Sequence, residues 1–184
     1  MNTKQIIVIV IVVALMGALL ARPIKGLVTE NKGATASAAT ESSSAFNFQS
    51  VSDITKQSIN ASLAQEITAL EAKVNEASGQ EKLALLEELA KKWDDLAKYA
   101  PQGFIYEEMA KISPKFEYWL KAGDAFRSAY TNLQDTAMAT ELNRLAIQSY
   151  EKATELDGNN LDAKTGLGAA MVTGTNNPMA GIAV

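Results

Sequence analysis

From Asp53 onward, apolar side chains recur at the spacing of one helical face. The intervals are three to five residues, mostly three or four, through Ile54, Ile59, Leu63, Ile67, Leu70 and Val74. A recurrence close to the helical period places such side chains along one side of an α-helix. Ser78 and Gly79 end the pattern. The period predicts an all-α fold, with one N-terminal helix over residues 51–82 that packs on the helices after it or leads into them.

A second helical pattern follows, and its polar side carries charges of both signs. Its apolar face is formed by Leu83, Leu86, Leu89, Trp93 and Leu96. Glu87 and Lys91 are four residues apart, which is the spacing of stabilising ion pairs on a helix surface. Neighbouring carboxylates with lysines one turn away are typical of a solvated face, so we do not interpret them as catalytic pairs.

The N-terminal part contains an uncharged apolar segment, Ile6 to Ala21. As a helix it would extend roughly 24 Å, and long cationic side chains at its ends can extend the span towards the roughly 30 Å of a bilayer core. We therefore expect residues 1–31 to form a short tail and a single transmembrane anchor. A cleaved signal peptide is the alternative, although Arg22 and Pro23 make a poor cleavage site after Ala21.

Small residues inside this segment allow two interpretations. Gly17 and Ala21 are four residues apart, a spacing that lets two helices approach closely in a membrane. They either pack on a partner helix or belong to an ordinary anchor. The flanking charges do not decide the orientation of the anchor. Residues 32–50 are rich in Ala, Ser and Thr without apolar periodicity, which predicts a flexible linker.

Composition excludes several kinds of chemistry. The 184 residues include neither Cys nor His, and the formal net charge is -4. Disulfides and thiolate nucleophiles are therefore impossible, and the usual general base near neutral pH is missing. No basic stripe is present to bind nucleic acid. The GLGAA sequence at Gly166 follows no strand, so it is not a dinucleotide signature. We predict a non-enzyme without cofactor or metal.

A longer period appears in the C-terminal half. ELDGNNLDAKTGLGAAMV around Asp157 is similar to the junction between two tetratricopeptide (TPR) repeats, in a family with a unit of roughly 34 residues. The resemblance implies an α-solenoid of helical hairpins over residues 83–184. Its units would cover about 83–115, 116–160 and an incomplete 161–184. Because this last unit stops within its second helix, we expect further repeats beyond Val184.

The TPR pattern pairs small residues where two helices cross and fills the space between repeats with large ones. Ala90, Gly123, Ala146 and Gly168 resemble the small positions, whereas Gln102 stands where alanine is expected. The residues that resemble the large positions are Trp93, Trp119, Phe126 and Tyr150. Gly123 and Ala146 are 23 positions apart, about eleven more than in the family. This difference indicates an insertion in the turn around Asp135, with both flanking helices lengthened.

If this register holds, the first helices of the units line a groove that binds proteins. The candidate partner-binding residues are Glu87, Lys91, Asp94, Glu117, Asp124 and Arg127. The alternative is that these residues are ordinary solvated charges. A two-lysine clamp for carboxylate termini is missing from the pattern, so chaperone-tail binding is not expected.

The arrangement of tail, anchor, linker and repeats resembles envelope TPR proteins of the Bacteroidetes. In that group Asp-Thr followed by a small residue is an O-glycosylation signal in the periplasm, and Asp135-Thr136-Ala137 matches it at Thr136. The resemblance implies a single-pass inner-membrane protein whose soluble domain is periplasmic. We expect a scaffold or accessory subunit that binds proteins of a secretion, translocon or envelope-assembly complex. The alternative is a periplasmic holdase-like chaperone for secreted or outer-membrane clients.

Overall fold

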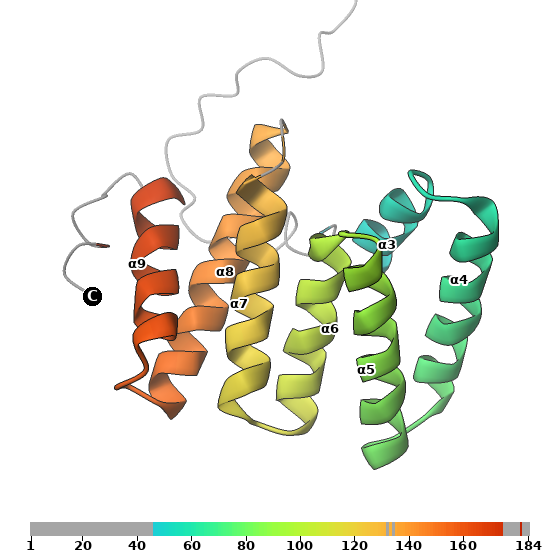
Figure 1. Cartoon of the computed structure of the whole chain (residues 1–184), viewed down its shortest axis with the longest axis horizontal. Coiled ribbons are helices and arrows are strands. Elements are labelled where there is room, and N and C mark those ends of the chain that lie inside the picture. The colour runs from blue at the N-terminus through green and yellow to red at the C-terminus, as the bar shows by residue number, and fades with distance from the viewer. Residues whose placement is uncertain (1–45, 132, 134, 175–180, 182–184) are drawn as a thin grey trace, which may run out of the picture. The chain divides into compact units, whose positions relative to one another are not determined.

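The computed structural model describes residues 46–131, 133, 135–174 and 181, and these residues are all-α (Figure 1). They all belong to the second of two units into which the chain divides, residues 39–184. No strand occurs among them. Their helices are α3 (Phe48–Lys56), α4 (Ala61–Glu76), α5 (Gly79–Asp95), α6 (Tyr99–Ile112), α7 (Phe116–Thr131), α8 (Thr136–Leu156) and α9 (Leu161–Gly174).

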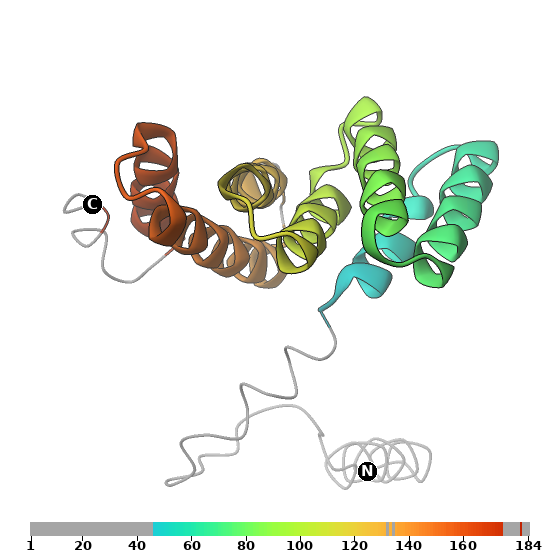
Figure 2. The ribbon, with the colours of Figure 1, turned by 90° about the horizontal axis from the view of Figure 1, so that it is seen from below.

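Consecutive helices pack against one another as a series of hairpins. The helix α5 packs on α6, α6 on α7, α7 on α8 and α8 on α9. Figures 1 and 2 show α5, α7 and α9 along one side of this unit and α6 and α8 along the other. The additional contact between α7 and α9 agrees with this arrangement. Short connections make sequence neighbours antiparallel neighbours in space.

The apolar face predicted for residues 83–96 is the buried side of α5. Leu86 is 2% exposed, and both Leu89 and Trp93 are fully buried. Together with Ile67, Leu70 and Val74 of α4 and with Met109 of α6 they form one core cluster. A second cluster surrounds Phe126 of α7 and Tyr150 of α8, which are also fully buried. Trp119, which was expected in the core, is only partly buried and packs against neither cluster.

The single helical face expected from Ile54 to Val74 is wrong. The chain ends α3 at Lys56 and starts α4 at Ala61, and the Asn60 side chain caps α4 by accepting a hydrogen bond from the Ser62 amide at 2.8 Å. Asparagine is a strong helix N-cap, so the local preference for a new helix start outweighs the apolar period. As a result Ile54 is 56% exposed and Leu63 is 37% exposed.

The anchor predicted at the N-terminus falls outside the described residues. Residues 1–45 include the predicted anchor Ile6–Ala21, with Gly17 and Ala21, and most of the predicted linker. Within the helices that are described, no segment has both the length and the apolar character needed to cross a membrane. The predicted linker is too long at its C-terminal end, because Asn47 caps α3 and the helix begins at Phe48. Phe46 and Phe48 both pack against the core clusters. The rings of Phe46 and Phe104 are 5.9 Å apart.

Candidate partner-binding groove

A cleft of about 380 Å³ lies where α5, α6 and α7 meet. We call it the α5–α7 cleft. It is lined by Glu87, Lys91, Asp94, Tyr106, Met109, Tyr118 and Lys121. The lining combines two tyrosines with side chains of both charges, while Met109 is fully buried. It therefore offers apolar area and hydrogen-bonding groups together.

The α5 side of the cleft carries three of the residues predicted from the sequence. Glu87, Lys91 and Asp94 are exposed and follow one another at intervals of four and three residues. This spacing aligns them along one strip of the helix, beside the buried face of Leu86, Leu89 and Trp93. The apolar period that buries one side of α5 thus determines which charged side chains face the cleft.

Both carboxylates of the cleft accept hydrogen bonds from a neighbouring helix. The Tyr118 hydroxyl of α7 donates to Glu87 Oε1 at 3.4 Å. The Gln102 amide of α6 donates to Asp94 Oδ1 at 3.2 Å and to the Ala90 carbonyl at 3.4 Å. Gln102 is 6% exposed. It stands where the repeat pattern expects alanine, and its side chain links α6 to α5 through these two hydrogen bonds.

The two tyrosines of the cleft each carry a lysine over the ring. Lys121 Nζ lies 5.4 Å from the centroid of Tyr106, and Lys115 Nζ lies 5.4 Å from that of Tyr118. Such cation–π contacts contribute about 0.5–1 kcal/mol at exposed sites. Burial raises the pKa of Tyr106, with further contributions from the negative charges of Asp94 and Glu87. The Tyr106 phenol therefore stays neutral at physiological pH.

Asp124 and Arg127 lie outside the lining of the cleft and bind Tyr150 instead. The Tyr150 hydroxyl donates to Asp124 Oδ1 at 2.6 Å and accepts a hydrogen bond from Arg127 Nε at 3.1 Å. Burial raises the pKa of Tyr150, and the hydrogen bond to Asp124 raises it further. The hydrogen bond to Tyr150 is the main reason why the pKa of Arg127 is raised. These three residues hold α7 on α8.

The remaining candidates lie at helix starts. Glu117 is exposed in the first turn of α7 and is not among the cleft residues. Thr136 is exposed as the first residue of α8. Asp135 before it is the N-cap, and its carboxylate accepts hydrogen bonds from the amides of Ala137 at 2.9 Å and Met138 at 3.1 Å. The glycosylation signal thus coincides with a helix cap.

Four residues of the cleft were not predicted as partner-binding residues: Tyr106, Met109, Tyr118 and Lys121. Lys121 is four residues after Glu117 and three before Asp124, so helical spacing placed it on the face already proposed. Tyr118 gave no such signal, because its position depends on how α7 crosses α5. The described residues contain no group of three or more acidic side chains arranged to hold a metal ion.

Comparison with known proteins gives no relative. No protein-family model matches the chain, and neither a curated protein nor a solved structure matches it. Functional inference therefore depends on the geometry of the helices and on the resemblance of the repeat pattern.

Proposed function

We propose that this chain is a non-catalytic, membrane-anchored TPR scaffold that binds a protein partner in the α5–α7 cleft. In this proposal Ile6–Ala21 anchors it in a bacterial inner membrane, and the helical unit serves as an accessory subunit of a secretion, translocon or envelope-assembly complex. The observation that carries the proposal is the open cleft on α5 and α7, the first helices of the repeat pattern, where Glu87, Lys91 and Asp94 converge with Tyr106 and Tyr118.

The hairpin packing supports the repeat assignment. Large buried rings occupy sites that small residues create. A Cβ atom on Gly103 of α6 would lie 2.5 Å from the Phe126 ring, and one on Gly123 of α7 would lie 2.8 Å from the Tyr150 ring. The crossing of Gly103 and Phe126 lies between the proposed units 83–115 and 116–160, whereas that of Gly123 and Tyr150 joins the two helices of the second unit. A solenoid of helical hairpins needs close packing of both kinds.

The cleft chemistry supports binding of a polypeptide. Tyrosine offers a large rigid contact area with a polar end, which is why it is frequent in protein interfaces. Lys91 and Lys121 can pair with acidic groups of a partner, and Glu87 and Asp94 with basic groups. Glu87 and Asp94 accept hydrogen bonds from Tyr118 and Gln102, which orients them before a partner binds.

A periplasmic location of the helical unit is part of the proposal. Its support is the exposed Thr136 within the Asp135-Thr136-Ala137 signal. Mass spectrometry of the peptide that contains Thr136, from protein isolated from its native membranes, tests this assignment. A hexose-containing modification that disappears in Thr136→Val is expected. An unmodified peptide would remove this support for the location.

The function is tested by purifying the full-length tagged protein from membranes in mild detergent and identifying the proteins that accompany it. We expect a stoichiometric set of membrane proteins. The double variant Lys91→Glu/Lys121→Glu should lose them, because it reverses both lysine charges of the cleft. Lys73→Glu, at an exposed position on α4, is the matched control and should retain them. A monodisperse wild-type protein without partners would contradict the scaffold role.

One structural feature favours the chaperone alternative. A second cleft of about 300 Å³ has mainly apolar lining, including Val51, Ile54, Leu133 and Met138. A holdase needs such a surface for promiscuous clients. A diffuse collection of secreted proteins in the purification, together with suppression of their aggregation by the purified protein, would favour that function over the scaffold.

A further inference from the structure

The helix α3 is attached to the rest of the unit by a narrow side. Val51 is 3% exposed and Ser52 is fully buried, whereas Ile54 is 56% exposed and Asp53 is also exposed. The nine residues of α3 are too few for a stable isolated helix, since helices below about 12 residues are marginal in water. Its position therefore depends on the contacts that Val51, Ser52 and their neighbours make with α4 and α6.

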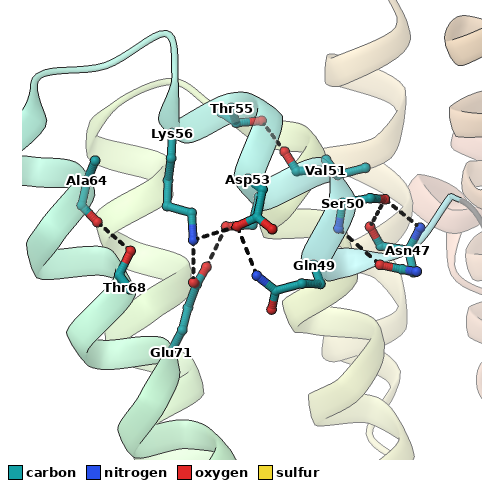
Figure 3. A network of polar contacts seen from close by, with 11 residues as sticks. Asn47, Gln49, Ser50, Val51, Asp53, Thr55, Lys56, Ala64, Thr68 and Glu71 are labelled. Carbon is teal, nitrogen blue, oxygen red and sulfur yellow. Dashed lines mark hydrogen bonds and ion pairs between the residues drawn. The ribbon is translucent and has the colours of Figure 1, made fainter.

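The polar part of this attachment is a buried ion pair between α3 and α4 (Figure 3). Glu71 is 5% exposed, and Lys56 Nζ lies 2.7 Å from Glu71 Oε2. The Ser52 hydroxyl donates to the other oxygen of Glu71. Lys56 also binds Asp53 at 2.9 Å, and Asp53 accepts a hydrogen bond from Gln49. A buried carboxylate is stable only while these partners remain in place.

Three surface clefts lie beside α3. One of about 760 Å³ is lined by Gln49, Asp53 and Lys56 on one side and by residues of α4 on the other. The apolar cleft described above lies beside Val51 and Ile54. A third, of about 640 Å³, lies beside Phe46 and Phe48. Open surface grooves thus border α3 on several sides, and its apolar attachment is concentrated at Val51 and Phe48.

We propose that α3 is a releasable strap, which detaches from α4 and α6 and returns while α4 to α9 remain folded. The contacts of Lys56 and Ser52 with Glu71 hold it in the closed position. Release uncovers the α6 surface beneath Phe46 and Val51, including Phe104, whose ring packs against Phe46 in the closed state. The strap thus controls access to an apolar surface on the opposite side of the unit from the α5–α7 cleft.

Hydrogen exchange of the full chain in mild detergent tests this inference. Amides of α3 should exchange through a local opening, faster than the buried amides of α7 and α8. Lys56→Met leaves Glu71 buried without its cation and should accelerate α3 exchange about a hundredfold. Ser52→Ala, a milder change, should accelerate it about tenfold. In both variants the α7 and α8 amides should stay within about threefold of wild type.

Lys92→Met is the matched control. It removes a lysine that binds Glu66 of α4 at 3.1 Å, in a pair with 34% and 52% exposed side chains. Because exposed ion pairs contribute little, α3 exchange should change by less than about threefold. Wild-type α3 amides that exchange as slowly as those of α8 would overturn the strap. Equal acceleration of α3 and α8 exchange in Lys56→Met would also overturn it. The same holds if neither Lys56→Met nor Ser52→Ala changes the exchange rate of α3.

Discussion

Tyr150 is held between glycines of two neighbouring helices. Cβ atoms on Gly123 of α7 and Gly166 of α9 would both collide with its ring. The ring is fully buried, so the space it occupies depends on the missing side chains of both glycines. Its hydroxyl is fixed as well, through Asp124 and Arg127. Close approach of two helices makes this residue sensitive to added volume at either glycine.

Gly123→Ala should destabilise the unit despite the better helix propensity of alanine. The propensity gain is about 1 kcal/mol, whereas overpacking a core costs about 1–3 kcal/mol, so a net loss of up to about 2 kcal/mol is expected. Urea unfolding followed by circular dichroism measures it. Gly158→Ala is the control, because the nearest atom to its Cβ is the Thr154 carbonyl oxygen at 3.4 Å. Equal midpoints for the two variants would contradict the tight packing of Tyr150.

Tyr150 also makes stability depend on alkaline pH. Its pKa is raised above the ordinary value of 10.0, so above pH 10 the unfolded tyrosine loses its proton while the folded one retains it. Stability should therefore fall by up to about 1.4 kcal/mol per pH unit above pH 10. Tyr150→Phe lacks this contribution and should show a shallower decline in urea unfolding. Contributions from other groups cancel in the comparison, so parallel declines would refute the assignment.

Residue burial was predictable from periodicity only where contacts are local to a helical face. The apolar side of α5 emerged correctly, including Trp93. The burial of Glu71 did not, because its partners Ser52 and Lys56 lie on another helix. Trp119 was expected in the core and is only partly buried. In both cases the burial of the side chain depends on how two helices cross. The spacing of residues within one helix does not predict that crossing.

At the scale of elements, α5 ends in an unusual way. Ala97 has a φ of 52°, a left-handed conformation that usually requires glycine. The Lys98 amide donates to the Trp93 carbonyl at 2.9 Å, and the Ala97 amide donates to the Asp94 carbonyl at 2.8 Å. These two bonds form a Schellman motif, which terminates α5 and directs the chain into α6.

Ala97→Gly should stabilise the protein. The left-handed conformation costs a non-glycine residue about 1–2 kcal/mol, and the greater freedom of glycine in the unfolded chain offsets about 0.5–1 kcal/mol of the gain. A net increase of about 0.5 kcal/mol in the free energy of unfolding is expected from urea titration. Ala84→Gly, at an exposed position within α5, is the control and should be destabilising by about 1 kcal/mol. Destabilisation by both substitutions would contradict the strained turn.

Helix boundaries followed from capping residues more reliably than from apolar period. The apolar period predicted one helix that continues across residues 57–60, but the structure has a break there before α4. Asn60 supplies the cap, as Asn47 does for α3. Both asparagines were visible in the sequence, so greater weight on capping residues would have separated α3 from α4. The end of α4 near Ser78 was recovered by that kind of signal.

At the scale of the whole molecule, the all-α class was predictable and the cleft was predictable in part. Helical spacing brought Glu87, Lys91 and Asp94 together, because all three belong to α5. It could not separate them from Asp124 and Arg127, which bind Tyr150, since that distinction depends on packing between α7 and α8. The aromatic side of the cleft likewise results from the placement of α6 and α7 beside α5.

The central claim is that the α5–α7 cleft contacts a protein partner. Photocrosslinking in living cells tests it most directly, with benzoylphenylalanine placed at Lys91 or Lys121 of the full-length chain and, as control, at exposed Lys73 on α4. We predict one discrete crosslinked partner from both cleft positions and none from Lys73. No crosslink from the cleft, or the same products from all three positions, would contradict the claim.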